Sequence, residues 1–286
     1  GGRVDLLYVA RRVPGSSGIA FTALDSKNLE TKWEAVLGTG VLAIQPADAS
    51  KSTWVVLTRS GHVFSVSAAT LAAGGVIDKP VGRIEIEGEF SDTAEPLKLP
   101  DGSYIFTPAG TPNRLFVRGA DAQVRPLDLL APLQRPVALF EDGILVPATD
   151  GRIYWISPAT GRPLADPFQP PLVSDKPSEW RGVGLTAKKT IIAVDSLGNL
   201  YQIEPRKDPA HLAERSGTKL PKPIRSGVVV TGNLVGGVDE SNVLHVWDAE
   251  ALTPISEIKL SAPASLGPVE PGGYHFVAVG DDELVC

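Results

Sequence analysis

Arginine recurs at one kind of position in this sequence, just before a short run of β-forming residues. The side chains are Arg135, Arg181 and Arg225. A guanidinium group presents its N–H donors in a plane that matches the two oxygens of a carboxylate or phosphate. Three such groups side by side would bind an anionic ligand or an acidic peptide. The alternative is that each arginine pairs with a carbonyl or carboxylate group of the protein itself.

Trp180 precedes Arg181 directly and adds a second kind of contact to this candidate site. An exposed Trp–Arg pair has the composition of an interface hot spot. Alternatively, the indole fills the space between two layers of strands. The predicted ligand-binding or partner-binding residues are therefore Arg135, Trp180, Arg181 and Arg225.

A second cluster of charge lies at Glu85, Glu87 and Glu89. Residues two apart in a strand share one face, so these carboxylates would lie together. They would form a cation site or a catalytic pair, or simply a charged outer strand that discourages edge pairing. We favour the charged strand, because the segment is expected at the periphery.

The remaining residues that could do chemistry form no recognisable site. The histidines are His62, His211, His245 and His275, and no two have the close spacing of a metal-binding pair. The sequence has no G-x-S-x-G nucleophile turn, no phosphate-binding P-loop and no dinucleotide-binding glycine motif. We therefore predict no catalytic residues, no metal and no cofactor.

The elements that must position these side chains repeat along the chain. In each copy a β-rich run reaches a small turn and an alternating strand leaves it, which is a hairpin signature. The clearest copies are residues 54–67, 144–157 and 191–204, and weaker ones end near residues 25, 119 and 248. A repeat of roughly 40–50 residues filled with short strands is typical of a β-propeller.

We therefore predict an all-β, single-domain β-propeller with four-stranded antiparallel blades and partial blades at the two ends. Seven blades are favoured, with six or eight left open. The approximate blades are residues 1–39, 40–82, 83–132, 133–178, 179–222, 223–262 and 263–286. Single helical turns are expected only at Leu71–Ala73 and Pro209–Arg215. In this fold the three arginines would lie on one face, beside the central channel.

Two motifs point to a family. Ala23-Leu24-Asp25 followed by Thr31-Lys32-Trp33, and Ser157-Pro158-Ala159-Thr160-Gly161, resemble degenerate copies of an ALDxxTGxxxW repeat. That repeat belongs to the PQQ-like (quinoprotein dehydrogenase-like) β-propellers. The resemblance implies the fold, but no cofactor ligand or catalytic residue of those enzymes matches a position here. A WD-repeat-like propeller is the second choice and depends on Trp247-Asp248 alone.

Composition excludes some classes of partner. The net charge of −6 lacks the basic footprint of a nucleic-acid-binding protein, and no apolar run is long enough to insert into a membrane. Gly1-Gly2 and the absence of Met suggest a piece of a longer protein. The PQQ-like resemblance favours a periplasmic, cell-envelope or extracellular location over the cytoplasm.

The function predicted from these observations is a non-enzymatic scaffold. It would bind a protein or peptide, acidic in character, or a small anionic ligand through loops around the channel. One alternative is an enzyme of the dehydrogenase, lyase or glycosidase type with its site at the channel mouth. The other is a structural spacer or dimerisation domain.

Overall fold

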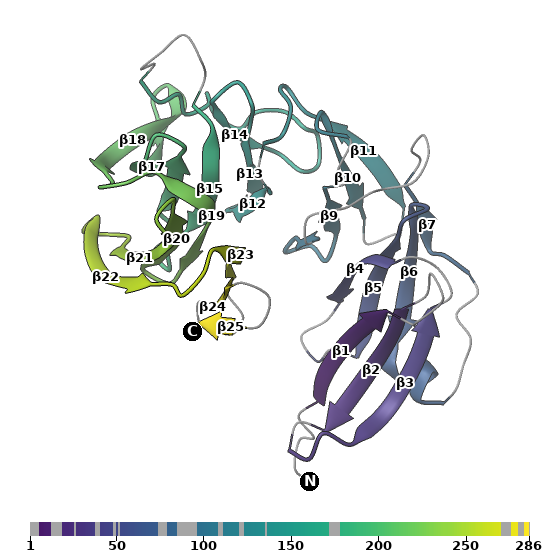
Figure 1. Cartoon of the computed structure of the whole chain (residues 1–286). Helices are drawn as coiled ribbons and strands as arrows, with labels where there is room; N and C mark the ends of the chain where they lie inside the picture. Colours follow the sequence, from purple (N-terminus) through teal and green to yellow (C-terminus); the bar gives the residue numbers. More distant parts are fainter. Residues whose placement is uncertain are drawn as a thin grey trace. The chain divides into compact units, whose positions relative to one another are not determined.

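The computed structural model of the chain, shown in Figure 1, is built almost entirely of β-strands. In its described part there is one short helix, α1 (Ala68–Ala72). The chain divides into two compact units, Gly1–Leu127 and Asp128–Cys286. The described residues are 6–12, 19–25, 27–37, 41–47, 50, 52–73, 79–84, 96–107, 111–119, 123–134, 136–171, 178–269, 276–279 and 283–285.

The first unit contains three antiparallel sheets. The first sheet has three strands, β1 (Leu6–Arg12), β2 (Ile19–Asp25) and β3 (Thr31–Leu37). The second sheet has four, β4 (Val41–Pro46), β5 (Thr53–Thr58), β6 (His62–Ser67) and β7 (Gly82–Arg83). The third sheet also has four, β8 (Leu97–Lys98), β9 (Tyr104–Phe106), β10 (Arg114–Arg118) and β11 (Val124–Asp128).

The second unit contains four sheets. The first comprises β12 (Ala138–Phe140), β13 (Gly143–Pro147) and β14 (Ile153–Ile156). The next comprises β15 (Trp180–Leu185), β16 (Ile191–Asp195), β17 (Asn199–Lys207) and β18 (Ala210–Lys219). The third comprises β19 (Ile224–Thr231), β20 (Leu234–Asp239), β21 (Val243–Asp248) and β22 (Thr253–Lys259). The last comprises β23 (Ala264–Val269), β24 (Phe276–Val279) and β25 (Glu283–Val285).

In each of these sheets, strands that follow one another in the chain pair side by side. This up-and-down order confirms the predicted all-β class and the antiparallel pairing within each repeat. Four of the sheets have four strands in the described residues and three have three. The number of blades in a closed ring stays a prediction.

The predicted hairpins form because a left-handed residue sits in each tight turn. Gly61, Gly151 and Gly198 have φ of 82°, 80° and 82°, a region that glycine enters without steric cost. Asn242 takes the same place with φ of 60°. The strands on either side then pair as expected, β5 with β6, β13 with β14, β16 with β17 and β20 with β21.

Neighbouring sheets of the second unit pack face to face. Adjacent residues of β16 face opposite sides, since Ile191 packs with Trp180 and Leu145, whereas Ile192 packs with Ile224 and Val235. The central strand is thus buried on both faces. Each such side chain contributes about 1.5–3 kcal/mol when it leaves water.

The first unit uses aromatic side chains for the same purpose. Trp54 of the second sheet lies 4.6 Å from Tyr8 and 5.1 Å from Phe21 of the first, measured between ring centroids. On its other face the second sheet packs Leu57 against Phe106 of the third. Stacked sheets with a shared core therefore build both units.

Two segments differ from the prediction. Pro209–Arg215 is not a helical turn, because Ala210–Lys219 forms β18 and pairs with β17. In the predicted blade of residues 133–178, the fourth strand is reduced to isolated bridges, Ile156 with Pro163 and Ile153 with Phe168. Pro163 has no N–H to donate, which limits the ladder at that point.

Candidate functional site

Arg181 lies in an irregular step at the start of β15. The strand pairs Trp180 with Asp195 and then Gly182 with Val194, so Arg181 is the extra residue of a bulge. Its side chain is 25% exposed, and its Nη2 lies 3.8 Å from a carboxylate oxygen of Glu179. The Nε atom is buried and has no hydrogen-bond partner. A buried donor without a partner is costly, so this N–H could gain from an acceptor that binds here.

Arg225 occupies the corresponding place on the next inner strand. β19 pairs Ile224 with Asp239 and resumes its ladder at Val228, so Arg225 also lies in a bulge. It is exposed. The repeat therefore places two arginines at matching positions of consecutive sheets, as the sequence predicts.

The starts of β15 and β19 lie side by side. A Cβ added to Gly227 would lie 4.0 Å from the carbonyl oxygen of Arg181, and one added to Gly182 would lie 2.8 Å from the Cβ of Val228. Glycine permits this approach because it has no side chain at the contact. The backbones that carry Arg181 and Arg225 are thus neighbours.

The other two predicted site residues are Arg135 and Trp180. Arg135 lies outside the described residues. Trp180 is fully buried, with its ring against Phe168 and Tyr201. Its Nε1 donates to the carbonyl oxygen of Arg152 at 3.3 Å. The indole therefore packs between two sheets, the alternative that the sequence left open, and anchors the strand that carries Arg181.

Two buried carboxylates hold the turns beside the arginines, and sequence analysis did not identify them. Asp195 accepts hydrogen bonds from the backbone N–H of Leu197 and Asn199 and from the hydroxyl of Tyr201. It is fully buried. Burial is the main cause that raises the pKa of Tyr201, so its hydroxyl keeps its proton and donates to Asp195.

Asp239 repeats the arrangement one sheet later. It accepts from the backbone N–H of Ser241 and Val243 and contacts Nε2 of His245 at 3.0 Å. Desolvation raises the pKa of Asp239, but the bonds from His245, Val243 and Ser241 outweigh it and hold the pKa below its usual range. The second ring nitrogen of His245 lies 3.2 Å from Glu257.

Comparison with solved structures identifies the architecture. BamB from Moraxella catarrhalis aligns with a TM-score of 0.58 at 15% identity, over 97% of this chain and 86% of BamB. Hsv2 from Kluyvelomyces marxianus aligns with a TM-score of 0.52 at 11% identity, over 84% of this chain and 78% of Hsv2. The computationally designed Ika8 protein aligns with a TM-score of 0.56 at 10% identity, over 96% of this chain and 81% of Ika8. The chain is a β-propeller. The likeness to these three structures confirms the propeller fold predicted from the sequence.

Sequence comparison adds no relative to this result. No protein-family profile matches the propeller's sequence, and no curated protein matches it. At 10–15% identity the structural likenesses establish the fold alone.

The register of the propeller's strands places several cations at one end of two sheets. Trp180 pairs with Asp195 and Asn199 with Lys219, so these four residues share one end of the sheet β15–β18. Ile224 with Asp239 and Val243 with Lys259 mark the same end of β19–β22. We call this the basic end, because its cations are Arg181, Lys219, Lys222, Arg225 and Lys259.

The lysines of the basic end brace its turns. Lys219 donates to the carbonyl oxygen of Leu197 and Lys259 to that of Ser241. Lys222 donates to the hydroxyl of Ser241 at 2.9 Å. Among the described residues of this end, the carboxylates are the buried Asp195 and Asp239 and the exposed Glu179 and Glu240. The five cations therefore outnumber these four carboxylates, on a protein whose net charge is −6.

The other candidates from the sequence are not gathered into a site by the described residues. Glu85, Glu87 and Glu89 lie outside them, as does His275. Among the residues that are described, no group of three His, Cys, Asp or Glu side chains could hold a metal ion. His62, His211 and His245 contact Ser60, Pro209 and Asp239 respectively.

Proposed function

We propose that this propeller is a non-enzymatic scaffold that binds an acidic segment of a protein partner at the basic end. The observation that carries the proposal is the equivalence of Arg181 and Arg225. Both lie in the bulge at the start of an inner strand, on neighbouring backbones. Arg135, at the start of the preceding inner strand in the sequence, would extend the site.

Charge and hydrogen bonding support an acidic partner. Carboxylates would accept from the guanidinium groups of Arg181 and Arg225, including the Nε of Arg181, which has no partner. Lys219, Lys222 and Lys259 add positive potential around them while they brace the turns. The buried aspartates and Trp180 hold the backbone in place, so little order has to be gained on binding.

The proposed location follows from the resemblance of the sequence to PQQ-like repeats. PQQ-like repeats are common in envelope and secreted proteins, so we propose a periplasmic, cell-envelope or extracellular location. Within the described ranges, no helix is long and apolar enough to cross a membrane.

The experiment is a binding titration with a fluorescent glutamate-rich peptide and a neutral glutamine-rich peptide of the same length. We expect the glutamate-rich peptide to bind, and Arg181→Ala or Arg225→Ala to weaken binding by about three- to tenfold each. Added salt should also weaken binding, because the local cations rather than the net negative charge govern it.

Arg206→Ala is the matched control. Arg206 is a charged residue of the same sheet, at the far end of β17, where it pairs with Glu204 at 2.7 Å. Its removal should leave the affinity unchanged. Equal affinity of the wild-type, R181A and R225A chains for the glutamate-rich peptide would refute the proposal.

A further inference from the structure

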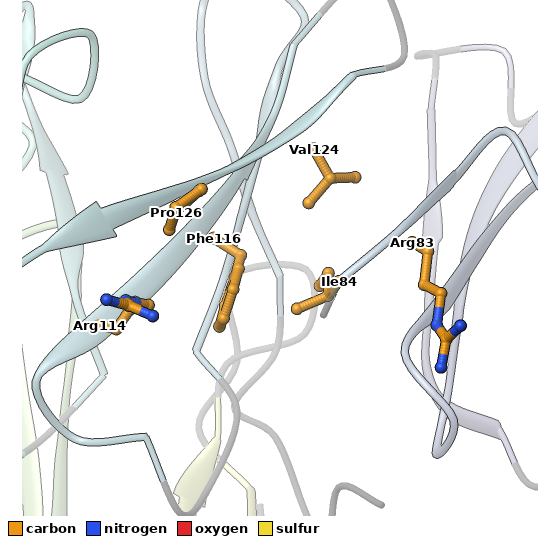
Figure 2. Close-up of a pocket in the computed structure, with 6 residues that line it drawn as sticks. All are labelled: Arg83, Ile84, Arg114, Phe116, Val124 and Pro126. Atoms are coloured by element: carbon orange, nitrogen blue, oxygen red, sulfur yellow. The ribbon is translucent and has the colours of Figure 1, made fainter. Parts of the chain in front are cut away.

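A pocket in the first unit lies between the sheets β4–β7 and β8–β11. Its volume is about 330 Å³. Figure 2 shows its lining side chains, which come from the end of β7 and from β10 and β11. They are Arg83, Ile84, Arg114, Phe116, Val124 and Pro126.

The middle of the pocket is apolar and firmly held. Ile84 and Phe116 are 1% and 4% exposed and belong to the core that joins the two sheets. Val124 packs against the same core, and Pro126 is exposed beside it on β11. A ligand here would meet a surface of side chains that cannot donate or accept hydrogen bonds.

The two arginines lie at opposite sides of this apolar group in Figure 2. Arg83 ends β7 and Arg114 begins β10, and both are exposed. In the strand register Arg83 pairs with His62, as Lys219 pairs with Asn199 and Lys259 with Val243. The lysines brace turns, whereas Arg83 lines a pocket.

We propose that this pocket binds an acidic peptide segment in which one large apolar side chain is flanked by two carboxylates. The apolar side chain would cover Ile84, Phe116, Val124 and Pro126, and one carboxylate would reach each arginine. A small anion would leave the apolar surface uncovered, and a fatty acid has a single carboxylate for two separated cations. A volume near the lower limit of ligand pockets also suits one side chain rather than a cofactor.

The site is independent of the basic end in residues and in unit, so either proposal can fail alone. To separate them, the test uses the full chain with Arg181 and Arg225 already replaced by Ala. The probe is a fluorescent, end-blocked peptide containing Glu-Phe-Glu. Two further peptides replace the glutamates by lysine or the phenylalanine by serine.

We expect the Glu-Phe-Glu peptide to bind and the lysine version not to bind. The serine version should bind about tenfold more weakly, because it loses the apolar contact. Arg83→Gln and Arg114→Gln should each lower the affinity for the Glu-Phe-Glu peptide by about two- to fivefold, the size expected for the loss of an exposed charge pair.

Arg125→Gln is the matched control, because Arg125 lies between Val124 and Pro126 on β11 and its side chain points to the other face of the strand. It should leave the affinity unchanged, and thermal unfolding checks that each variant is folded. Equal binding of the acidic and lysine peptides, or unchanged affinity in R83Q and R114Q, would overturn the proposal. So would a fatty acid such as laurate that binds more tightly than the peptide.

Discussion

At the scale of single residues, the basic end depends on side chains that look ordinary in the sequence. Asp195 and Asp239 each precede a tight turn, where aspartate is common for purely local reasons. The structure shows that they also bond to Tyr201 and His245 on the next strand. Sequence predicted the positions of Arg181 and Arg225 but not these supports, because the supporting contact joins two strands through their register.

The pH dependence of stability tests the role of Asp239. Its pKa in the folded protein lies below the usual value, so its bonds stabilise the fold above about pH 4 and this stabilisation is lost as the pH falls through the lower folded value. The side chain of the Asp239→Asn variant cannot ionise, so its contribution to stability lacks this dependence on pH. Urea unfolding of both chains should show a difference in stability at about pH 6 that is smaller at about pH 3. A constant difference would show that the charge of Asp239 contributes nothing.

At the scale of elements, turns and hairpins were predictable and strand-to-strand distances were not. Gly61, Gly151 and Gly198 mark turns because their backbone is left-handed, which sequence patterns reveal. β18 was missed because Ala210–Arg215 favours a helix locally, whereas pairing with β17 decides its structure. Gly182 and Gly184 let β15 approach β19, a contact that the sequence patterns did not indicate.

Gly182→Ala tests this close approach. The new methyl group would lie 2.8 Å from both the Cβ and the carbonyl oxygen of Val228, so backbone must move. We expect a loss of about 1–3 kcal/mol in the free energy of unfolding, measured with urea. Gly227→Ala is the control, since its methyl group would meet only the oxygen of Arg181 at 4.0 Å. Similar losses in both variants would contradict the packing described for these strands.

At the scale of the whole molecule, the repeat predicted the fold and left the partner open. Alternating strands and the degenerate repeat in Ala23-Leu24-Asp25 and Thr31-Lys32-Trp33 were enough to predict a propeller. The basic end could not be predicted in full, because its five cations come from separate segments that only the strand register unites. The net charge of −6 did not indicate the five cations of the basic end, because it sums the charges of the whole chain.

The central claim is that Arg181 and Arg225 select an acidic partner, and reversing their charge tests it most directly. The measurement is the affinity of the Arg181→Glu/Arg225→Glu chain for matched glutamate-rich and lysine-rich peptides, with circular dichroism to verify the fold. We predict that the folded variant no longer binds the glutamate-rich peptide and binds the lysine-rich peptide instead. A folded variant that keeps its affinity for the glutamate-rich peptide would contradict the account.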